Sequence, residues 1–177
     1  GPVGEHRDGE AWENAYRNEW RYAVESVRKA ATYAGEHGVL LAIEPINRYE
    51  SYLVNTAEQG MQFISEVGSE FVKLHLDTFH MNIEESDPIR AVRSAGDSLV
   101  NVHISDSNRQ AVGRGHFDFA ALMRALKEMG YDGLLTLEPL PPVPDPFIAM
   151  RTARYVSLWD VYARESLQRL RDLETSV

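Results

Sequence analysis

The 177-residue sequence contains no cysteine, so it can form neither a disulfide nor a thiolate zinc site. Basic residues are also few, since 18 Lys and Arg stand against 27 Asp and Glu and give a formal net charge of -9. No run of five or more basic residues is present. Because a nucleic-acid or anionic-membrane surface needs clustered Lys and Arg, the composition predicts that neither nucleic acid nor a membrane is a partner.

Long apolar runs are missing as well. No stretch approaches the ~20 consecutive apolar residues of a membrane-spanning helix, and no secretory signal is present. Together with the lack of cysteine, this favours a cytoplasmic protein. The first residue is not Met, so we expect a processed or truncated piece. With 44% hydrophobic residues, the sequence can form one ordinary globular domain over residues 1–177.

Four short apolar segments have the composition of buried strands, and each leads into a residue that could bind a metal. The segments cover residues 40–44, 71–77, 99–104 and 134–138. They lead to Glu44, Asp77, His103 and Glu138. Helices are predicted over residues 10–37, 57–67, 88–96, 119–129 and 147–173. Strands that alternate with helices indicate right-handed βαβ units and a parallel sheet.

Capping residues support three of the predicted helix starts. Thr56 and Gln59 form a capping box, and Gly68 ends the same helix. Asp87 precedes a first-turn proline, and Asp118 caps the helix that begins at residue 119. Each capping residue therefore predicts the position at which its helix begins.

Side-chain alternation distinguishes the two faces of the predicted sheet. One face carries apolar residues such as Leu74, Leu76 and Val102, which suit packing under helices. The other face is mixed and becomes polar toward the carboxyl ends of the strands. An open doubly wound sheet would be apolar on both faces. Within the α/β fold class, the difference between the two faces therefore favours a (β/α)8 TIM barrel. In such a barrel, functional groups lie at the C-terminal ends of the strands.

The four residues at the strand ends share one face, so neighbouring strands about 4.8 Å apart should bring them together. Three carboxylates and one imidazole form a mostly hard, oxygen-rich set, which suits Mn²⁺, Mg²⁺ or Co²⁺ better than a closed structural zinc. Buried charges of one sign are costly unless they are paired or bind a metal. We therefore predict a shared metal site.

The remaining histidines are interpreted as structural. His75 lies in mid-strand and faces the interior, so we expect a hydrogen-bonded core histidine and not a ligand. His6, His37 and His116 are expected on the surface or in loops. None of them is included in the predicted metal site.

Three blocks around the predicted ligands resemble the signature segments of the ketose 3-epimerases. They read AIEPINRYE over 42–50, LDTFHMNIEE over 76–85 and VHISDSNR over 102–109. The spacing between the four candidate ligands is also similar to that of this family. Ketose 3-epimerases of the D-tagatose and D-psicose type belong to the xylose-isomerase-like (β/α)8 superfamily. The resemblance therefore implies a TIM barrel, of which this chain is the C-terminal half.

The resemblance also implies a role for each matching residue. Divalent metal, usually Mn²⁺, would be bound by Glu44, Asp77, His103 and Glu138. Glu44 and Glu138 would act as the acid/base pair that inverts C3 of a ketose through a cis-enediolate. Substrate oxygens would be hydrogen-bonded by Glu50, His80 and Arg109. Arg109 would also offset the negative charge of the site.

Half a barrel leaves two exposed strand edges and an uncovered inner face. We therefore expect either a missing N-terminal half-barrel or self-association into a homo-oligomer. Ser105 and Ser107 stand where the family often carries other residues, and we interpret them as tolerated differences. Residues 139–146 are predicted to form a long loop at a position where members of the family differ in sequence. We therefore expect this loop to give little information about the substrate.

Other functions stay open at this stage. Hydroxypyruvate isomerase, inosose dehydratase or another sugar isomerase of the superfamily would use a similar set of ligands. Endonuclease IV is disfavoured, because it needs more histidine ligands and a basic surface facing DNA. A metal-binding remnant without turnover is a third alternative. No glycine-rich phosphate-binding loop opens a predicted helix, which favours a free sugar over a phosphorylated one.

Overall fold

A four-stranded parallel sheet forms the centre of the computed structural model, which describes residues 12–145, 148–149 and 151–177. The strands are β1 (Leu41–Ile43), β2 (Val72–Asp77), β3 (Leu99–Ile104) and β4 (Leu134–Leu137). They pair in the order β1-β2-β3-β4, and every neighbouring pair is parallel. The predicted parallel sheet is therefore confirmed, with all four strands in their predicted segments.

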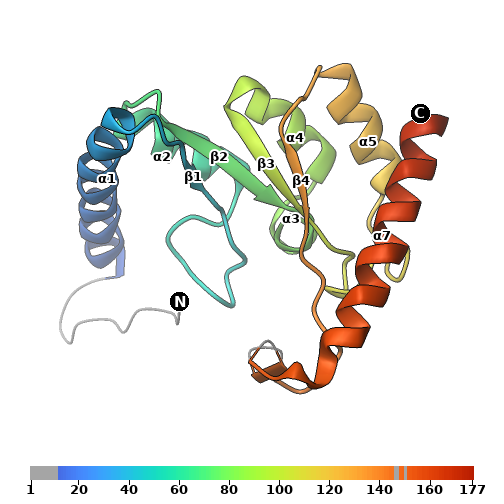
Figure 1. The fold of residues 1–177 in the computed structure, drawn as a ribbon. Coiled ribbons are helices and arrows are strands. Elements are labelled where there is room, and N and C mark those ends of the chain that lie inside the picture. Colours follow the sequence, from blue (N-terminus) through green and yellow to red (C-terminus); the bar gives the residue numbers. More distant parts are fainter. Residues whose placement is uncertain (1–11, 146–147, 150) are drawn as a thin grey trace.

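Helices line the sheet in a row that runs from α1 at one end to α7 at the other (Figure 1). They are α1 (Trp12–Glu36), α2 (Ala57–Val67), α3 (Thr78–Glu84), α4 (Pro88–Ala95), α5 (Phe119–Glu128) and α7 (Val156–Ser176). Two 3-10 turns accompany them, η1 (Gly96–Ser98) and η2 (Ala153–Tyr155). Within the described residues, no helix is long and apolar enough to span a membrane.

The predicted capping residues set the helix starts. Thr56 accepts a hydrogen bond from the backbone N–H of Gln59, whose side chain bonds back to the Thr56 backbone. Asp87 and Asp118 cap α4 and α5 through their carboxylates, which accept the backbone N–H groups of Arg90 and Ala121. Gly68 ends α2 with φ 69°, a left-handed conformation that favours glycine. The capping predictions are therefore confirmed.

One helix was not predicted, and another prediction needs correction. The segment after β2 forms α3, because the Asp77 carboxylate accepts the backbone N–H of Phe79 and caps this helix. The helix predicted over 147–173 needs correction, since within the described residues the 3-10 turn η2 precedes α7, and α7 covers 156–176. Thr152 bonds back to the Ala149 carbonyl through its N–H and its hydroxyl, which closes a turn before α7.

Some predictions fall outside the described residues. These are the first residues of the two predicted terminal helices, at positions 10 and 147, and the assignment of His6 to a loop.

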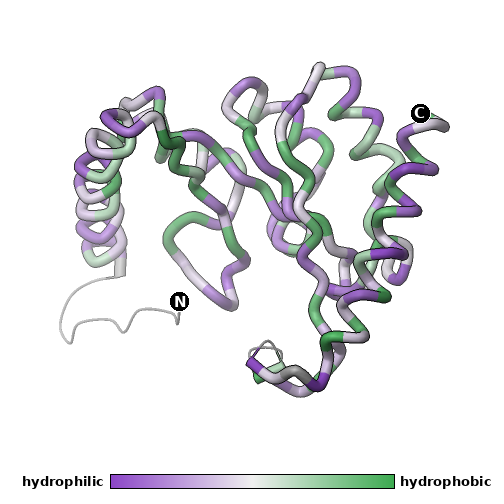
Figure 2. Tube along the Cα trace, in the orientation of Figure 1, coloured by the Kyte–Doolittle hydropathy of each residue, from purple (hydrophilic) through white to green (hydrophobic). Residues whose placement is uncertain are grey.

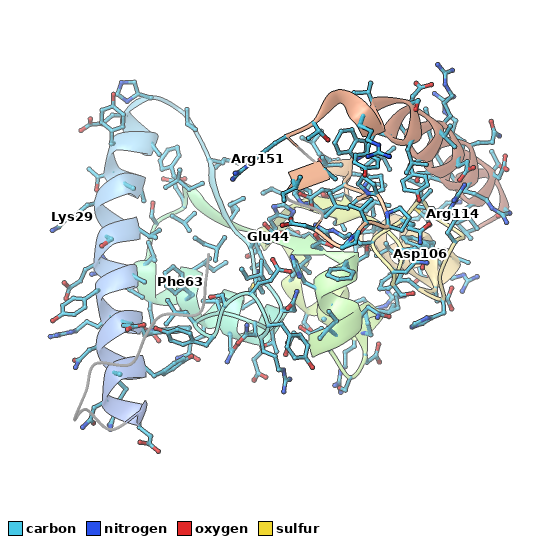
Figure 3. The ribbon with its side chains drawn as sticks, turned by 90° about the horizontal axis from the view of Figure 1, so that it is seen from below. Lys29, Glu44, Phe63, Asp106, Arg114 and Arg151 are labelled. Atoms are coloured by element: carbon cyan, nitrogen blue, oxygen red, sulfur yellow. The ribbon has the colours of Figure 1, made fainter. Side chains whose placement is uncertain are left out.

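The hydrophobic core lies between the sheet and the helices. Leu74, Leu76 and Val102 are buried there, each at most 1% exposed. A second cluster joins α1 to α2 and β2, with Phe63 between α1 and the sheet (Figure 3). Hydrophobic residues follow the strands in Figure 2. The predicted apolar face is therefore the one that packs against the helices.

The opposite face of the sheet is open at its two edge strands. Ala42 of β1 is exposed, and so are Leu134 and Thr136 of β4. Leu134 alone keeps 69% of its surface accessible, although it is a large apolar residue. This face is the concave interior in a complete barrel. The structure thus shows part of a (β/α) barrel, with helices on one side, as predicted.

Candidate metal centre

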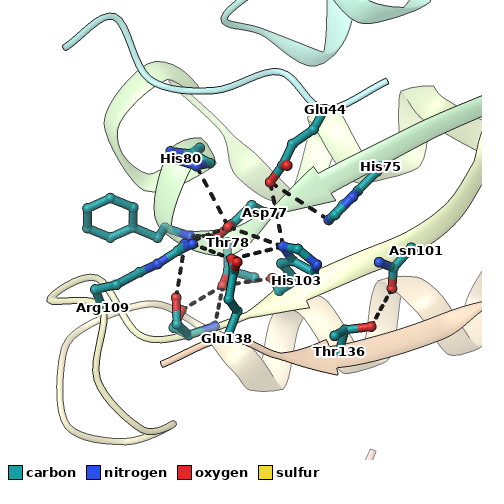
Figure 4. Close-up of polar contacts among 12 residues, drawn as sticks. Glu44, His75, Asp77, Thr78, His80, Asn101, His103, Arg109, Thr136 and Glu138 are labelled. Carbon is teal, nitrogen blue, oxygen red and sulfur yellow. Dashed lines mark hydrogen bonds and ion pairs between the residues drawn. The ribbon is translucent and has the colours of Figure 1, made fainter. Parts of the chain in front are cut away.

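Four side chains from four neighbouring strands converge at the carboxyl end of the sheet (Figure 4). Glu44, Asp77, His103 and Glu138 each offer one ligand atom, and these atoms lie within 4.8 Å of one another. Asp77 is the last residue of β2, whereas Glu44 and Glu138 come one residue after β1 and β4. His103 comes one residue before the end of β3. The predicted convergence is observed, although only Asp77 is the last residue of its strand.

Strand register explains why the four residues share a face. Asp77 pairs with His103, which pairs with Thr136 of β4. Glu138 lies two residues beyond Thr136 and therefore points to the same side. Its backbone N–H donates to the Ile104 carbonyl at 2.9 Å, which continues the hydrogen bonding of β4 to β3. The backbone thus fixes the direction of each ligand.

His103 lies among three carboxylates. Its Nδ1 is 2.9 Å from Glu138 Oε2, 3.6 Å from Glu44 Oε1 and 3.8 Å from Asp77 Oδ2. Burial alone would lower the pKa of His103, but the three carboxylates raise it to about 11. In return, although burial opposes it, His103 helps to hold the pKa of Asp77 well below its usual range and lowers that of Glu44.

Two buried nitrogens at this point form no hydrogen bond of good geometry within the described residues, namely His75 Nε2 and His103 Nδ1, although His103 Nδ1 lies 2.9 Å from Glu138 Oε2. An unsatisfied buried nitrogen is costly, so its presence needs an explanation. A divalent cation among the three carboxylates would accept the lone pair of His103 Nδ1 and balance the excess negative charge. The donor set therefore fits a divalent metal.

The prediction that His75 is a hydrogen-bonded core histidine is wrong at its Nε2 atom. In the part of the chain that the structure describes, this atom has no hydrogen-bond partner, and it lies 3.8 Å from Glu44 Oε1. The ring meets that of His103 edge to face, with centroids 3.9 Å apart. Burial lowers the pKa of His75, which favours the neutral ring. Glu44, His75 and His103 form a second possible ligand group. The sequence did contain a signal for this second group, because His75 stands two residues before Asp77 and therefore on the same face of the strand.

Arg109 closes the site on the side of β4. Its guanidinium donates to Asp77 Oδ2 at 2.5 Å and to Glu138 Oε2, and it lies 4.9 Å from the ring centroid of Phe79. Its backbone has φ 62°, which is unusual for a residue other than glycine. Arg109 thus offsets the charge of two predicted metal ligands, as the resemblance implied.

The loop that holds Arg109 is organised by a buried carboxylate that the sequence analysis missed. Asp106 is 1% exposed and accepts backbone N–H groups from Ser107, Gly113 and Phe117. Burial would raise the pKa of Asp106, but hydrogen bonds from the backbone hold it below the ordinary value. A Cβ at Gly115 would overlap Asp106 Oδ1, so glycine is required there. In the sequence, Gly113 and Gly115 were the features that could have indicated a loop folded tightly around Asp106.

A cavity of about 540 Å³ opens beside the four converging residues. Glu44 and Glu138 line it, together with the three predicted substrate-binding residues Glu50, His80 and Arg109. The rest of its wall is mostly apolar and consists of Ile46, Phe79, Asn108, Leu140, Pro141, Pro142 and Val143. The loop after β4, expected to say little about the substrate, therefore forms part of the pocket. His37 and His116 are exposed, as predicted.

Residues 3–172 match the family model described as xylose isomerase-like TIM barrel. The chain belongs to this family. It is 42% identical to the L-ribulose 3-epimerase of Mesorhizobium japonicum over 144 residues, which cover 81% of the chain and 48% of that protein. It is also 42% identical to the D-psicose 3-epimerase of Ruminiclostridium cellulolyticum over 123 residues, covering 70% of the chain and 42% of the relative.

The fold agrees with this assignment to the xylose isomerase-like family. A solved structure of L-ribulose 3-epimerase superposes with a TM-score of 0.81 at 36% identity, covering 98% of this chain and 58% of that one. The chain spans about half the length of the curated relatives it matches. The resemblance to the ketose 3-epimerases is thereby confirmed, and so is the partial barrel.

Proposed function

We propose that this chain carries the metal-binding and acid/base half of a ketose 3-epimerase. One observation carries the proposal: Glu44 and Glu138 come from the two edge strands of the sheet, yet both reach the same ligand cluster and line the same cavity. Inversion at a carbon needs one group to remove a proton and another to return one on the opposite face. Two carboxylates that approach one point from opposite ends of a sheet suit this task.

In this proposal, a divalent metal is held by the four residues Glu44, Asp77, His103 and Glu138. Mn²⁺ is the metal we favour, and Mg²⁺ or Co²⁺ would suit the same oxygen-rich donors. When bound, such an ion polarises a carbonyl oxygen and makes the neighbouring C–H more acidic. His103 would coordinate through Nδ1, the atom that lies among the three carboxylates.

The chain's own residues then carry the proton steps. Glu44, whose pKa is lowered by its neighbours His103 and His75 against the effect of burial, is ionised and ready to accept the C3 proton. Glu138, which must carry a proton at the start of the step, returns that proton to the opposite face of C3. The sugar thereby regains the proton that it lost, and exchange with water then deprotonates Glu44 and reprotonates Glu138. In the reverse direction the two residues exchange roles. Glu50, His80 and Arg109 hold the sugar oxygens near the reacting carbon.

The pocket becomes complete only when the open face of the sheet is covered. The exposed Leu134 and the uncovered edges of β1 and β4 leave one side of the site in contact with water. We propose that a further half-barrel covers this face, or that a second copy of the chain does so. Size-exclusion chromatography with light scattering separates these cases, because a dimer at micromolar concentration supports self-association and a monomer contradicts it.

The test of the proposed activity is proton exchange at C3 in D₂O, followed by NMR with Mn²⁺-loaded chain and a panel of ketohexoses and ketopentoses. Exchange reports removal of the proton even if net epimerisation is slow. We expect deuterium at C3 with the wild type and a loss of at least about 100-fold in Glu44→Gln and Glu138→Gln, since general base catalysis contributes about 10²–10⁴-fold. Glu128→Gln, at an exposed position on α5, is the matched control and should exchange like the wild type.

Absence of exchange with every sugar contradicts the proposal for this chain. If one Mn²⁺ still binds under those conditions, the chain is a metal-binding part whose chemistry requires the covering half. The fact that the chain spans about half of its relatives makes this the second candidate function.

A further inference from the structure

Asn47 is a buried amide in the loop after β1, only 2% exposed, and it contacts two predicted substrate-binding residues. Its side-chain Nδ2 donates to Glu50 Oε1 at 2.8 Å and lies 2.8 Å from His80 Nδ1. Its backbone N–H also donates to His80 Nδ1, at 3.3 Å. A single residue therefore contacts a carboxylate and an imidazole that line the same cavity.

The orientation of the Asn47 amide follows from its other partner. Its Oδ1 accepts the backbone N–H of Tyr49 at 3.0 Å. If the amide were turned over, its NH₂ group would face that N–H, and its oxygen would face the carboxylate of Glu50. Both contacts would become repulsive. The NH₂ group is thus directed at Glu50 and His80.

The contacts determine which nitrogen of His80 carries the proton. Nδ1 receives two N–H donors from Asn47, so it must act as an acceptor. The ring proton then resides on Nε2, which faces Asp77 Oδ2 at a distance of 3.8 Å (Figure 4). This separation exceeds a hydrogen bond, which leaves the Nε2–H available to a ligand.

We propose that Asn47 is a positioning residue that holds His80 as a hydrogen-bond donor and Glu50 as a hydrogen-bond acceptor in the substrate pocket. Glu50 uses Oε1 to bind Asn47 and keeps Oε2 for a ligand. The pocket therefore presents one donor and one acceptor whose relative placement is fixed by one buried amide. This pair matches an α-hydroxy ketone, in which the carbonyl oxygen accepts and the adjacent hydroxyl donates.

The choice of an α-hydroxy ketone rests on the proposed function, whereas the assignment of the His80 tautomer does not. It can be measured without a substrate, on the full chain loaded with diamagnetic Mg²⁺. Two-dimensional ¹H–¹⁵N NMR of the histidine rings distinguishes Nε2–H from Nδ1–H, and the signals of His80 are assigned by their loss in His80→Gln. We expect the Nε2–H form in the wild type.

Asn47→Asp replaces the donating NH₂ with an oxygen that accepts a proton. In this variant we expect His80 to carry a proton on Nδ1. Asn55→Asp is the matched control, because Asn55 lies in the same loop but its amide donates to the carbonyls of Ile46 and Ser51 and not to His80. The control should keep the Nε2–H form.

An Nδ1–H ring in the wild type overturns the proposal, even if Asn47→Asp fails to fold. An unchanged Nε2–H ring with no Nδ1 proton in a folded Asn47→Asp overturns it as well. Where C3 exchange is observed, Asn47→Asp should lower kcat/KM by about 10–100-fold with Mn²⁺ affinity unchanged, a range typical of residues that orient a functional histidine. A correct tautomer without exchange refutes the proposed function alone.

Discussion

Replacing Arg109 with Met tests how the charges of the metal centre are balanced. The guanidinium pairs with Asp77, whose side chain is fully buried, and with Glu138. Methionine keeps much of the apolar stem but removes the charge. Without Arg109, the partners of the Asp77 carboxylate that can carry positive charge are, among the described residues, His103 and His80. The metal-free chain should therefore lose stability.

The size of this loss can be worked out from burial. Removal of one partner from a buried ion pair typically costs about 3–5 kcal/mol, because the other charge stays buried. Asp77 is 0% exposed, but the Glu138 side chain is 38% exposed and screened by water, so we expect the lower limit of about 3 kcal/mol. For a chain of this size, 1 kcal/mol shifts Tm by about 2–4 °C. The metal-free Tm should fall by roughly 6–12 °C.

Thermal unfolding followed by circular dichroism in EDTA measures this change. Arg164→Met is the matched control, because the Arg164–Asp160 pair within α7 is exposed and screened by water, so its loss should leave the metal-free Tm close to that of the wild type. Added Mn²⁺ should raise Tm more in Arg109→Met than in the wild type, since the ion no longer shares its carboxylates with a guanidinium. An unchanged metal-free Tm, or weaker Mn²⁺ binding in the variant, would refute this account of the site.

Three further changes probe the same account. Mn²⁺ at about 100 times its Kd should stabilise the wild type by about 2.7 kcal/mol, seen as a Tm increase of about 5–11 °C that a chelator reverses. Uptake of Mn²⁺ at pH 8 should release about one proton, because His103 with a pKa of about 11 is protonated without metal and must be neutral to coordinate. Calorimetry in buffers of different ionisation enthalpy measures this proton, and a release of zero contradicts the prediction. Asp106→Asn should destabilise the chain at pH 7. The depressed pKa of Asp106 means that its stabilisation is present above the ordinary carboxyl pKa of about 4 and is lost as the pH falls through the folded value. Urea unfolding between pH 7 and pH 3 should therefore show a flatter pH dependence for the variant than for the wild type, and parallel curves contradict this.

The sheet could be predicted from sequence because each strand is a short apolar segment followed by a polar turn. Alternation placed Leu74 and Asp77 on opposite faces without any knowledge of pairing, since the period of a strand is two residues. Helix starts at Thr56 and Asp118 were equally accessible, because capping depends on residues close together in the chain. Local rules thus give the strand order along the chain and the face on which the ligands lie.

Other features depend on contacts between distant segments. Asp77 is both a strand end and the cap of α3, and a strand-end carboxylate gives no indication of the second role until the helix is seen. The left-handed backbone of Arg109 depends on hydrogen bonds to Asp106 and from Leu140, which no local pattern reveals. The surroundings of His75 are set by neighbouring strands, which place Glu44 3.8 Å from its Nε2 atom and the ring centroid of His103 3.9 Å from its own. These details arise only from packing.

The most direct test of the central claim is the position of a bound metal ion. Crystals of the chain grown with Mn²⁺ should give one strong anomalous peak between Glu44, Asp77, His103 and Glu138, within about 2.5 Å of a donor atom of each. Asp77→Asn crystals should lose most of that peak, because the buried carboxylate can no longer bind as an anion. A peak elsewhere on the chain, or no peak at saturating Mn²⁺, would contradict the claim that these four strand ends form a metal site.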